Sequence, residues 1–309
     1  MKLLIRLILL FTPIVGMIML YPYSPRTPYE ILDADGPCFH RTLWVYDRIH
    51  HSKAPIDIAF IGTSHTVEGI DDAYIQQAFD SSKWITNLGQ CFLGRNQQFE
   101  ILSYLLKEKE PKKIILELIY LEETKSHQNY YALAPRDSIL MSYPYHDWET
   151  YLNDVKGHFI FRIHAIQHEI FHSKAPLSTL HWGFSAFEDT NILENLEPVK
   201  NDWTDAGKEW INLRPYSYWR KDIFLHKMIA ACQQKGVEIE FLYVPTYYAP
   251  KLDQDSLAEL NLPGRIRIPP SYILNDPHGR LDAGHMNMTG ARKLSRWLVE
   301  EWTNEQKNH

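Results

Sequence analysis

The chain has 309 residues, of which 45% are hydrophobic and 13% aromatic, enough to bury the core of one large domain or of one domain with an insertion. Its 32 basic and 38 acidic side chains give a formal net charge of −6. This balance excludes a basic field that would draw the protein to nucleic acid, so we predict a globular protein with no nucleic-acid partner.

The first predicted element is a membrane anchor over residues 1–21. Lys2 and Arg6 precede the apolar run LILLFTPIVGMIML, which with its apolar flanks approaches the length of a bilayer span. No small-residue cleavage site follows, so an uncleaved anchor is favoured over a signal peptide. Basic flanks stay in the cytoplasm, which would leave the chain from about residue 25 onward outside it. A packed N-terminal helix is the alternative, although the run lacks an amphipathic period.

Residues 22–54 are rich in Pro, Tyr and Asp, which is typical of a linker. They contain one short amphipathic piece, RTLWVYDRIHH, which predicts a helix leading into the regular domain. We expect that domain to occupy residues 55–309.

Four continuous apolar runs have the pattern of strands buried on both faces. They lie at 56–62, 83–89, 112–121 and 237–245, and helical patterns lie between them at 71–80, 94–110 and 218–236. This alternation predicts an α/β fold with a parallel sheet of about five strands and helices on both sides. Active sites of such folds form where the strands end at their carboxyl edge, which is where Ser64 and Gly89 fall.

Residues 122–216 interrupt this alternation. The segment is crowded with Tyr, Trp, His and Phe, shows no clear strand, and is too long for an ordinary connection. We therefore predict a largely helical insertion that helps to shape a substrate pocket.

Three residues could form a nucleophilic site. Ser64 follows the first strand, whereas Asp282 and His285 lie in a loop before the last helical pattern. At a spacing of three residues in a turn, the carboxylate can hold one imidazole nitrogen while the other accepts a proton from a serine. The alternative is that Ser64, Asp282 or His285 merely caps a helix, although Thr289 is available to cap the last one.

These residues carry a resemblance to a known family. The strand and loop IGTSH with Ser64, the NLG turn with Gly89, and the DAGH loop with Asp282 and His285 resemble three sequence blocks of the SGNH (GDSL-type) hydrolase superfamily. The resemblance covers roughly residues 56–107 and 237–303. The apolar N-terminus and the long insertion are similar to those of membrane-anchored members that act in lipoteichoic acid D-alanylation or polysaccharide O-acetylation.

The resemblance implies a three-layer, flavodoxin-like domain in which Ser64 attacks an acyl carbonyl. His285 would take the serine proton and Asp282 would orient the imidazole. The backbone N–H groups of Ser64 and Gly89 would face the developing oxyanion.

One family block is missing. The strand that should end in glycine-x-asparagine ends in ELIYLEE here, which leaves a third oxyanion donor unassigned. Asn96, shortly after Gly89, is a tentative candidate, and a purely structural role at the start of a helix is its alternative.

Three further residues near these motifs have open roles. His65 either lines the pocket or makes a local hydrogen bond. Glu117 either faces the site from its strand end or packs there. Arg95 either steers an anionic group or lies in solvent at a helix start.

A rival motif, HEIFH at residues 168–172, matches the HExxH pattern of zinc proteases. On a helix, His168 and His172 would share one face, and Glu169 could polarise a zinc-bound water. The continuation that supplies a third ligand fails, leaving only the distant Glu194 or Glu197. We therefore predict no metal and no cofactor, and keep a zinc hydrolase as the less favoured alternative.

The three cysteines are odd in number and widely spaced, which fits neither a zinc site nor a disulfide framework. A bridge between Cys38 and Cys91 is one interpretation, and we favour buried free thiols for these two and for Cys232.

The combined expectation is a membrane-anchored, extracytoplasmic serine esterase or O-acyltransferase acting on an acylated cell-envelope glycan or polymer. Its expected partners are that substrate, the membrane and a membrane-bound acyltransferase. A non-catalytic partner of such an acyltransferase is the alternative.

Overall fold

The computed structural model describes residues 2–35, 41–118, 126–141, 148–184, 223–247 and 262–308. Its centre is a five-stranded, fully parallel sheet in the order β2-β1-β3-β4-β5. The strands are β1 (Ile58–Ile61), β2 (Ile85–Asn87), β3 (Lys113–Leu118), β4 (Glu238–Tyr243) and β5 (Arg265–Arg267). This is the flavodoxin-like strand order, so the predicted fold class is confirmed.

Each of the four predicted apolar runs contains one strand, and the inner strands are buried as expected. β5 was not predicted, because its three residues, Arg-Ile-Arg, carry two charges and no apolar run. It forms an edge strand beside β4, where arginine side chains find acidic partners.

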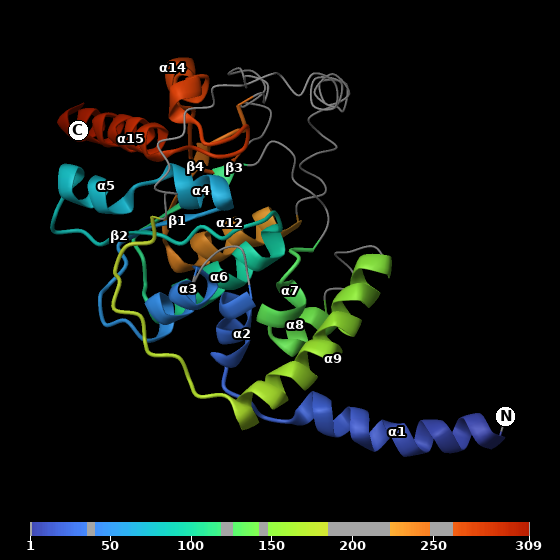
Figure 1. Cartoon of the computed structure of the whole chain (residues 1–309). Helices are drawn as coiled ribbons and strands as arrows, with labels where there is room; N and C mark the ends of the chain where they lie inside the picture. Colours follow the sequence, from blue (N-terminus) through green and yellow to red (C-terminus); the bar gives the residue numbers. More distant parts are fainter. Residues whose placement is uncertain are drawn as a thin grey trace.

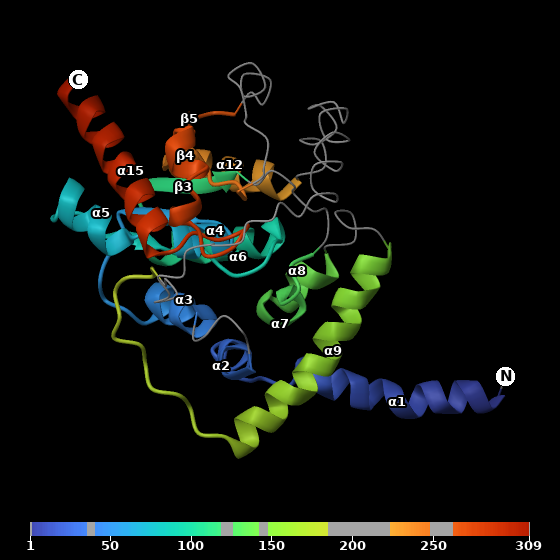
Figure 2. The ribbon, with the colours of Figure 1, turned by 45° about the horizontal axis from the view of Figure 1, so that its top comes forward.

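Helices cover both faces of the sheet (Figures 1 and 2). On one face lie α3 (Arg41–His50), α6 (Arg95–Glu108) and α12 (Ile223–Lys235); on the other lie α4 (Ser64–Gly69), α5 (Asp72–Phe79), α14 (Ser271–Leu274) and α15 (Met288–Asn308). Alternate strand residues supply the two cores: Ala59 and Ile61 pack toward α6, whereas Ile58 and Phe60 pack toward α15. The result is the predicted three-layer arrangement.

The predicted linker packs into the fold. Its described part forms α2 (Thr27–Asp35) and α3. Arg26 is buried and holds both helices, because its guanidinium donates to Asp47 at 2.9 Å and to Glu30 at 2.8 Å. Separating α2 from α3 would leave these buried charges without their partners, which is costly.

The N-terminal segment forms α1 (Lys2–Leu20), which Figure 1 shows extending away from the sheet beside α9 (Trp148–Phe171). Arg162 of α9 donates to the carbonyl oxygens of Ile18 and Tyr21 at the end of α1. Among the described residues, no helix has both the length and the apolar character needed to cross a membrane.

The described part of the insertion is mostly helical, and its residues 173–184 form neither helix nor strand. It comprises α7 (Tyr130–Leu133), α8 (Arg136–Leu140) and α9, and its apolar side chains form small clusters around Tyr130 and Phe161. Residues 122–125, 142–147 and 185–216 of this segment, Glu194 and Glu197 among them, lie outside the described residues.

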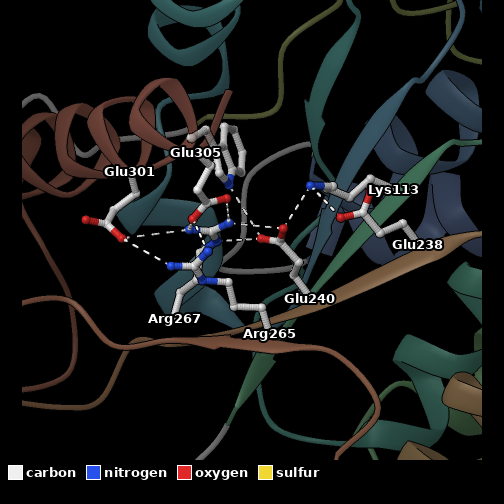
Figure 3. Close-up of polar contacts among 8 residues, drawn as sticks. Lys113, Glu238, Glu240, Arg265, Arg267, Glu301 and Glu305 are labelled. Atoms are coloured by element: carbon white, nitrogen blue, oxygen red, sulfur yellow. Dashed lines mark hydrogen bonds and ion pairs between the residues drawn. The ribbon is translucent and has the colours of Figure 1, made fainter. Parts of the chain in front are cut away.

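A buried ion-pair cluster joins the sheet edge to α15 (Figure 3). Arg267 of β5 donates to Glu240 of β4 and to Glu305 of α15 at 2.5 to 3.1 Å. Burial alone would raise the pKa of Glu240, but hydrogen bonds from Arg267 and Lys113 lower it to about 2. The cluster therefore anchors α15, the helix that directly follows the Asp282 and His285 loop.

The cysteines only partly follow the prediction. Cys232 is free and buried, as expected, and burial raises the pKa of its thiol to about 12. Cys91 is disulfide-bonded, so the expectation of a free thiol there was wrong. Cys38 lies outside the described residues. Pairing depends on which loops the fold brings together, and spacing along the chain does not reveal that.

Candidate active site

Ser64 is the first residue of α4, directly after β1. Thr63 is the N-cap of this helix: its hydroxyl accepts a hydrogen bond from the His65 N–H at 3.2 Å. The capping role that Ser64 could have filled is therefore taken by its neighbour. The Ser64 hydroxyl is left for a different contact.

That contact is with His285. Ser64 Oγ lies 2.9 Å from His285 Nε2, and His285 Nδ1 lies 2.9 Å from Asp282 Oδ2 and 3.0 Å from Oδ1. Ser64 and His285 are 221 positions apart in the sequence. Through these contacts the serine, histidine and aspartate side chains form one continuous series of hydrogen bonds. This arrangement holds the imidazole with one nitrogen facing the serine and the other facing the acid.

The Asp282 loop is shaped by its own hydrogen bonds. Asp282 Oδ1 accepts from the backbone N–H groups of Gly284 and His285 at 2.7 and 2.8 Å. Burial alone would raise the pKa of Asp282, but hydrogen bonds from His285 and Gly284 lower it. The acid is therefore ionised at neutral pH and can accept from the imidazole.

A separate residue caps α15. Asn287 Oδ1 accepts from the Gly290 N–H at 3.1 Å, and the Asn287 amide donates to carbonyl oxygens of the preceding loop. Neither Asp282, His285 nor Thr289 is needed for that cap. Because Asn287 caps α15, Asp282 and His285 are free to make the contacts with Ser64 described above.

Gly89 packs against the start of α4. A Cβ atom on this residue would lie only 2.9 Å from the Val67 nitrogen and 3.0 Å from the Thr63 carbonyl oxygen, so only glycine fits. Its N–H, which the family resemblance implies as an oxyanion donor, donates to Asn87 Oδ1 at 3.0 Å. By contrast, no hydrogen bond within the described residues uses the Ser64 N–H.

Asn87 is a residue near the site that was not predicted from the sequence. Its amide donates to the carbonyl oxygens of Thr66 and Ile70 at 2.7 and 2.9 Å, and these carbonyls lie at the end of α4. It is fully buried and contacts Gly89 as well. Asn87 therefore joins the end of β2 to the helix that carries Ser64.

Glu117 of β3 faces the Ser64 loop, so of the two roles left open for it the structure favours a position facing the site. Its carboxylate accepts from the Thr63 N–H and the Thr66 hydroxyl, both at 2.6 Å, and pairs with His65 Nδ1 at 3.2 Å. A Cβ on Gly62 would lie 2.2 Å from this carboxylate, so the strand end must be glycine for Glu117 to reach it. Glu117 therefore holds the turn that carries Ser64 through Thr63 and Thr66.

Arg95 and Asn96 lie at the start of α6 and are buried. Arg95 donates to the Glu117 carbonyl oxygen at 3.0 Å and to Gln98, so it is not a solvated side chain. The Asn96 amide donates to Ser126 Oγ at 2.7 Å, and its oxygen accepts from the His127 N–H at 3.0 Å. These bonds commit Asn96 to the 126–127 segment, and this geometry gives no support to a role as oxyanion donor.

The HEIFH motif lies at the end of α9, apart from Ser64. His168 and His172 stack with ring centroids 4.8 Å apart, as the helical spacing predicts. Glu169 accepts from the Thr27 hydroxyl at 2.5 Å and pairs with Lys174 at 3.8 Å. Within the described residues, no three acidic, histidine or cysteine side chains are grouped to hold a metal ion.

Glu68 lies one turn after Ser64 on α4 and is buried. Its Oε2 has no hydrogen-bond partner among the described residues. Burial raises the pKa of Glu68 to about 7, with a lowering effect from His285 and a raising effect from Asp282. A carboxyl group that changes charge near neutral pH therefore lies close to the triad.

We expect Glu68→Gln to change how stability depends on pH. The pKa of Glu68 in the folded state, about 7, exceeds its ordinary value of 4.5, so its contribution is complete below pH 4.5 and is lost as the pH rises through 7. Glutamine does not ionise. The free energy of unfolding of the variant, measured with urea, should therefore rise relative to the native protein over this interval.

The matched control is Glu300→Gln, at an exposed position of α15. It should follow the native protein at every pH. Parallel curves for Glu68→Gln and the native protein would contradict the assignment.

The chain was compared with protein-family models, with curated proteins and with solved structures, and one distant solved structure is similar to it. No protein-family model matches the chain, and no curated protein is significantly similar to it. A solved structure from Streptococcus pneumonia, described as a "putative platelet activating factor", aligns with 84% of this chain and 90% of its own length. The identity is 17% and the TM-score 0.31. The fold class follows from the order of the strands in the sheet, and the site from the distances between its side chains.

Proposed function

We propose that this protein is a serine-dependent acyl esterase or O-acyltransferase of the SGNH type. One observation carries the proposal: Ser64 Oγ, His285 and Asp282 form a continuous hydrogen-bonded chain with contacts of 2.9 Å at both ends of the imidazole. They lie at the carboxyl edge of a parallel sheet, where such folds place their chemistry.

The chemistry follows from this geometry. Ser64 Oγ attacks the acyl carbon while His285 Nε2 takes its proton, and the same nitrogen then protonates the departing oxygen. The acyl group is left as an ester on Ser64. In the second half, water or an acceptor hydroxyl attacks that ester, His285 takes its proton, and the proton returns to Ser64.

The developing oxyanion needs donors. The Ser64 N–H is available beside the attacking oxygen, and one such donor is typically worth about 3–4 kcal/mol. The Gly89 N–H is engaged with Asn87, so it would serve an oxyanion only by sharing or exchanging that hydrogen bond. This favours a site that acts on a selected substrate over a general esterase.

We further propose an extracytoplasmic location and an acylated envelope glycan or polymer as the substrate. The disulfide at Cys91 supports an oxidising compartment, because structural disulfides are rare in the cytosol. Attachment to a membrane through the apolar N-terminal segment, and cooperation with a membrane-bound acyltransferase, belong to the same proposal.

Labelling with a fluorophosphonate tests the proposal directly, because such probes react with activated serines. The native protein should be labelled at one site, and Ser64→Ala should abolish the label. Ser178→Ala, outside the triad, is the control and should be labelled like the native protein. A native protein that is not labelled would instead favour a non-catalytic partner of a membrane acyltransferase. The hydrogen bond from the Gly89 N–H to Asn87 is consistent with that alternative.

A further inference from the structure

A second carboxylate–histidine pair lies beside the triad. His65 Nδ1 is 3.2 Å from Glu117 Oε1, and the His65 ring stands edge-on to the His285 ring with centroids 5.8 Å apart. The Glu117 side chain is 1% exposed, whereas that of His65 is 16% exposed. A buried acid therefore fixes the orientation of a ring that solvent can still reach.

The acid also determines the tautomer of this ring. Burial alone would raise the pKa of Glu117, but hydrogen bonds from His65, Thr66 and Thr63 lower it, so the carboxylate is ionised at neutral pH. An ionised carboxylate only accepts hydrogen bonds, so His65 Nδ1 must carry the hydrogen. In the neutral ring, Nε2 is then a hydrogen-bond acceptor.

His65 lies on the side of Ser64 that faces the His285 loop. Its Nε2 is 3.9 Å from the position that a Cβ would occupy on Gly284, the residue before His285. Because His285 exchanges protons with the departing and incoming oxygens, groups packed on it line the side of the site where the alcohol binds. His65 therefore lies beside His285, on the side of the site where the alcohol of the proposed reaction would bind.

Building on the proposed function, we propose that His65 Nε2 accepts a hydrogen bond from a second hydroxyl of the alcohol, next to the reacting oxygen. This contact would make the site prefer polyols and glycans, which carry neighbouring hydroxyls, over aryl or simple alkyl alcohols. His65 takes no proton in this scheme, because His285 alone handles the proton of the reaction.

The test is a ratio of two kcat/KM values, one for glycerol monoacetate and one for 4-nitrophenyl acetate. Only the first ester offers neighbouring hydroxyls. Loss of one hydrogen bond of ordinary strength is expected to lower the ratio about tenfold in His65→Ala. His65→Gln, whose amide oxygen can accept a hydrogen bond, should retain more of the ratio than alanine does.

Ser64→Ala is the control that separates failure of the proposed function from failure of this inference. If Ser64→Ala cleaves both esters as fast as the native protein, the proposed function fails and this inference falls with it. If Ser64→Ala is inactive but His65→Ala keeps the native ratio, only this inference is overturned. Failure of the native protein to cleave the polyol ester, while it cleaves the aryl ester, also overturns it. Should His65→Ala not fold, His65→Phe retains a ring without a polar edge and gives the same test.

Discussion

His285→Ala is expected to lower kcat for an acyl ester by about 10⁴- to 10⁶-fold, because the serine loses the only group positioned to take its proton in the described site. The measurement is turnover of an aryl acetate by purified protein, with circular dichroism to verify folding. His278→Ala is the matched control, since this imidazole is exposed, lies near the same loop and makes no side-chain hydrogen bond among the described residues. Full activity in His285→Ala would remove the basis of the proposed mechanism.

Asp282→Asn should have a smaller effect, about 10²- to 10⁴-fold on kcat. The Asp282 side chain is 54% exposed, so water can take over part of its interaction with the imidazole. An asparagine at this position can still accept from the Gly284 and His285 N–H groups, which preserves the loop. A loss as large as that of His285→Ala would mean that orientation of the imidazole depends wholly on this acid.

The sequence was sufficient to predict four of the five strands and the edge of the sheet at which Ser64 lies. Apolar runs ending in glycine mark buried parallel strands, and the carboxyl ends of such strands share one edge, which places Ser64 and the Asp282 loop within reach of each other. The distances of 2.9 Å could not be predicted, because they depend on how α4 and α15 pack on the same face of the sheet.

The supporting residues were harder to predict. Glu117 is an acid inside an apolar run, and its signal is that an unpaired buried carboxylate would be costly, so partners must exist. The sequence does not say that those partners are the turn carrying Ser64. Asn87 gives a still weaker signal, because an asparagine at a strand end fits any turn, and only the packed structure reveals its bonds to α4.

Arg267→Met is expected to lower the free energy of unfolding by about 3–5 kcal/mol, because it leaves the buried Glu240 carboxylate without its main partner. Figure 3 shows the Arg267 guanidinium pointing toward the Glu240 carboxylate. The Arg267 side chain is 1% exposed and that of Glu240 is 5% exposed. Urea denaturation of both proteins measures the difference. A loss below about 1 kcal/mol, the range of exposed ion pairs, would contradict this assignment.

The same strand supplies the control. Arg265 also pairs with Glu305, but its side chain is 53% exposed, so Arg265→Met should cost less than about 1 kcal/mol. The two variants remove the same charge two residues apart, and they differ mainly in burial. Equal losses would show that net charge, and not the buried pair, determines the effect.

The pH dependence gives an independent check on Arg267→Met. The pKa of Glu240 in the folded state, about 2, lies below its ordinary value of 4.5, so the stability that this carboxylate contributes is present above pH 4.5 and is lost as the pH falls toward 2. Without Arg267 the ionised form of Glu240 is less favoured in the folded state, so the stability that this carboxylate contributes is smaller. The difference in stability between the native protein and Arg267→Met should therefore narrow as the pH falls through this interval, whereas a simple packing defect would leave it constant.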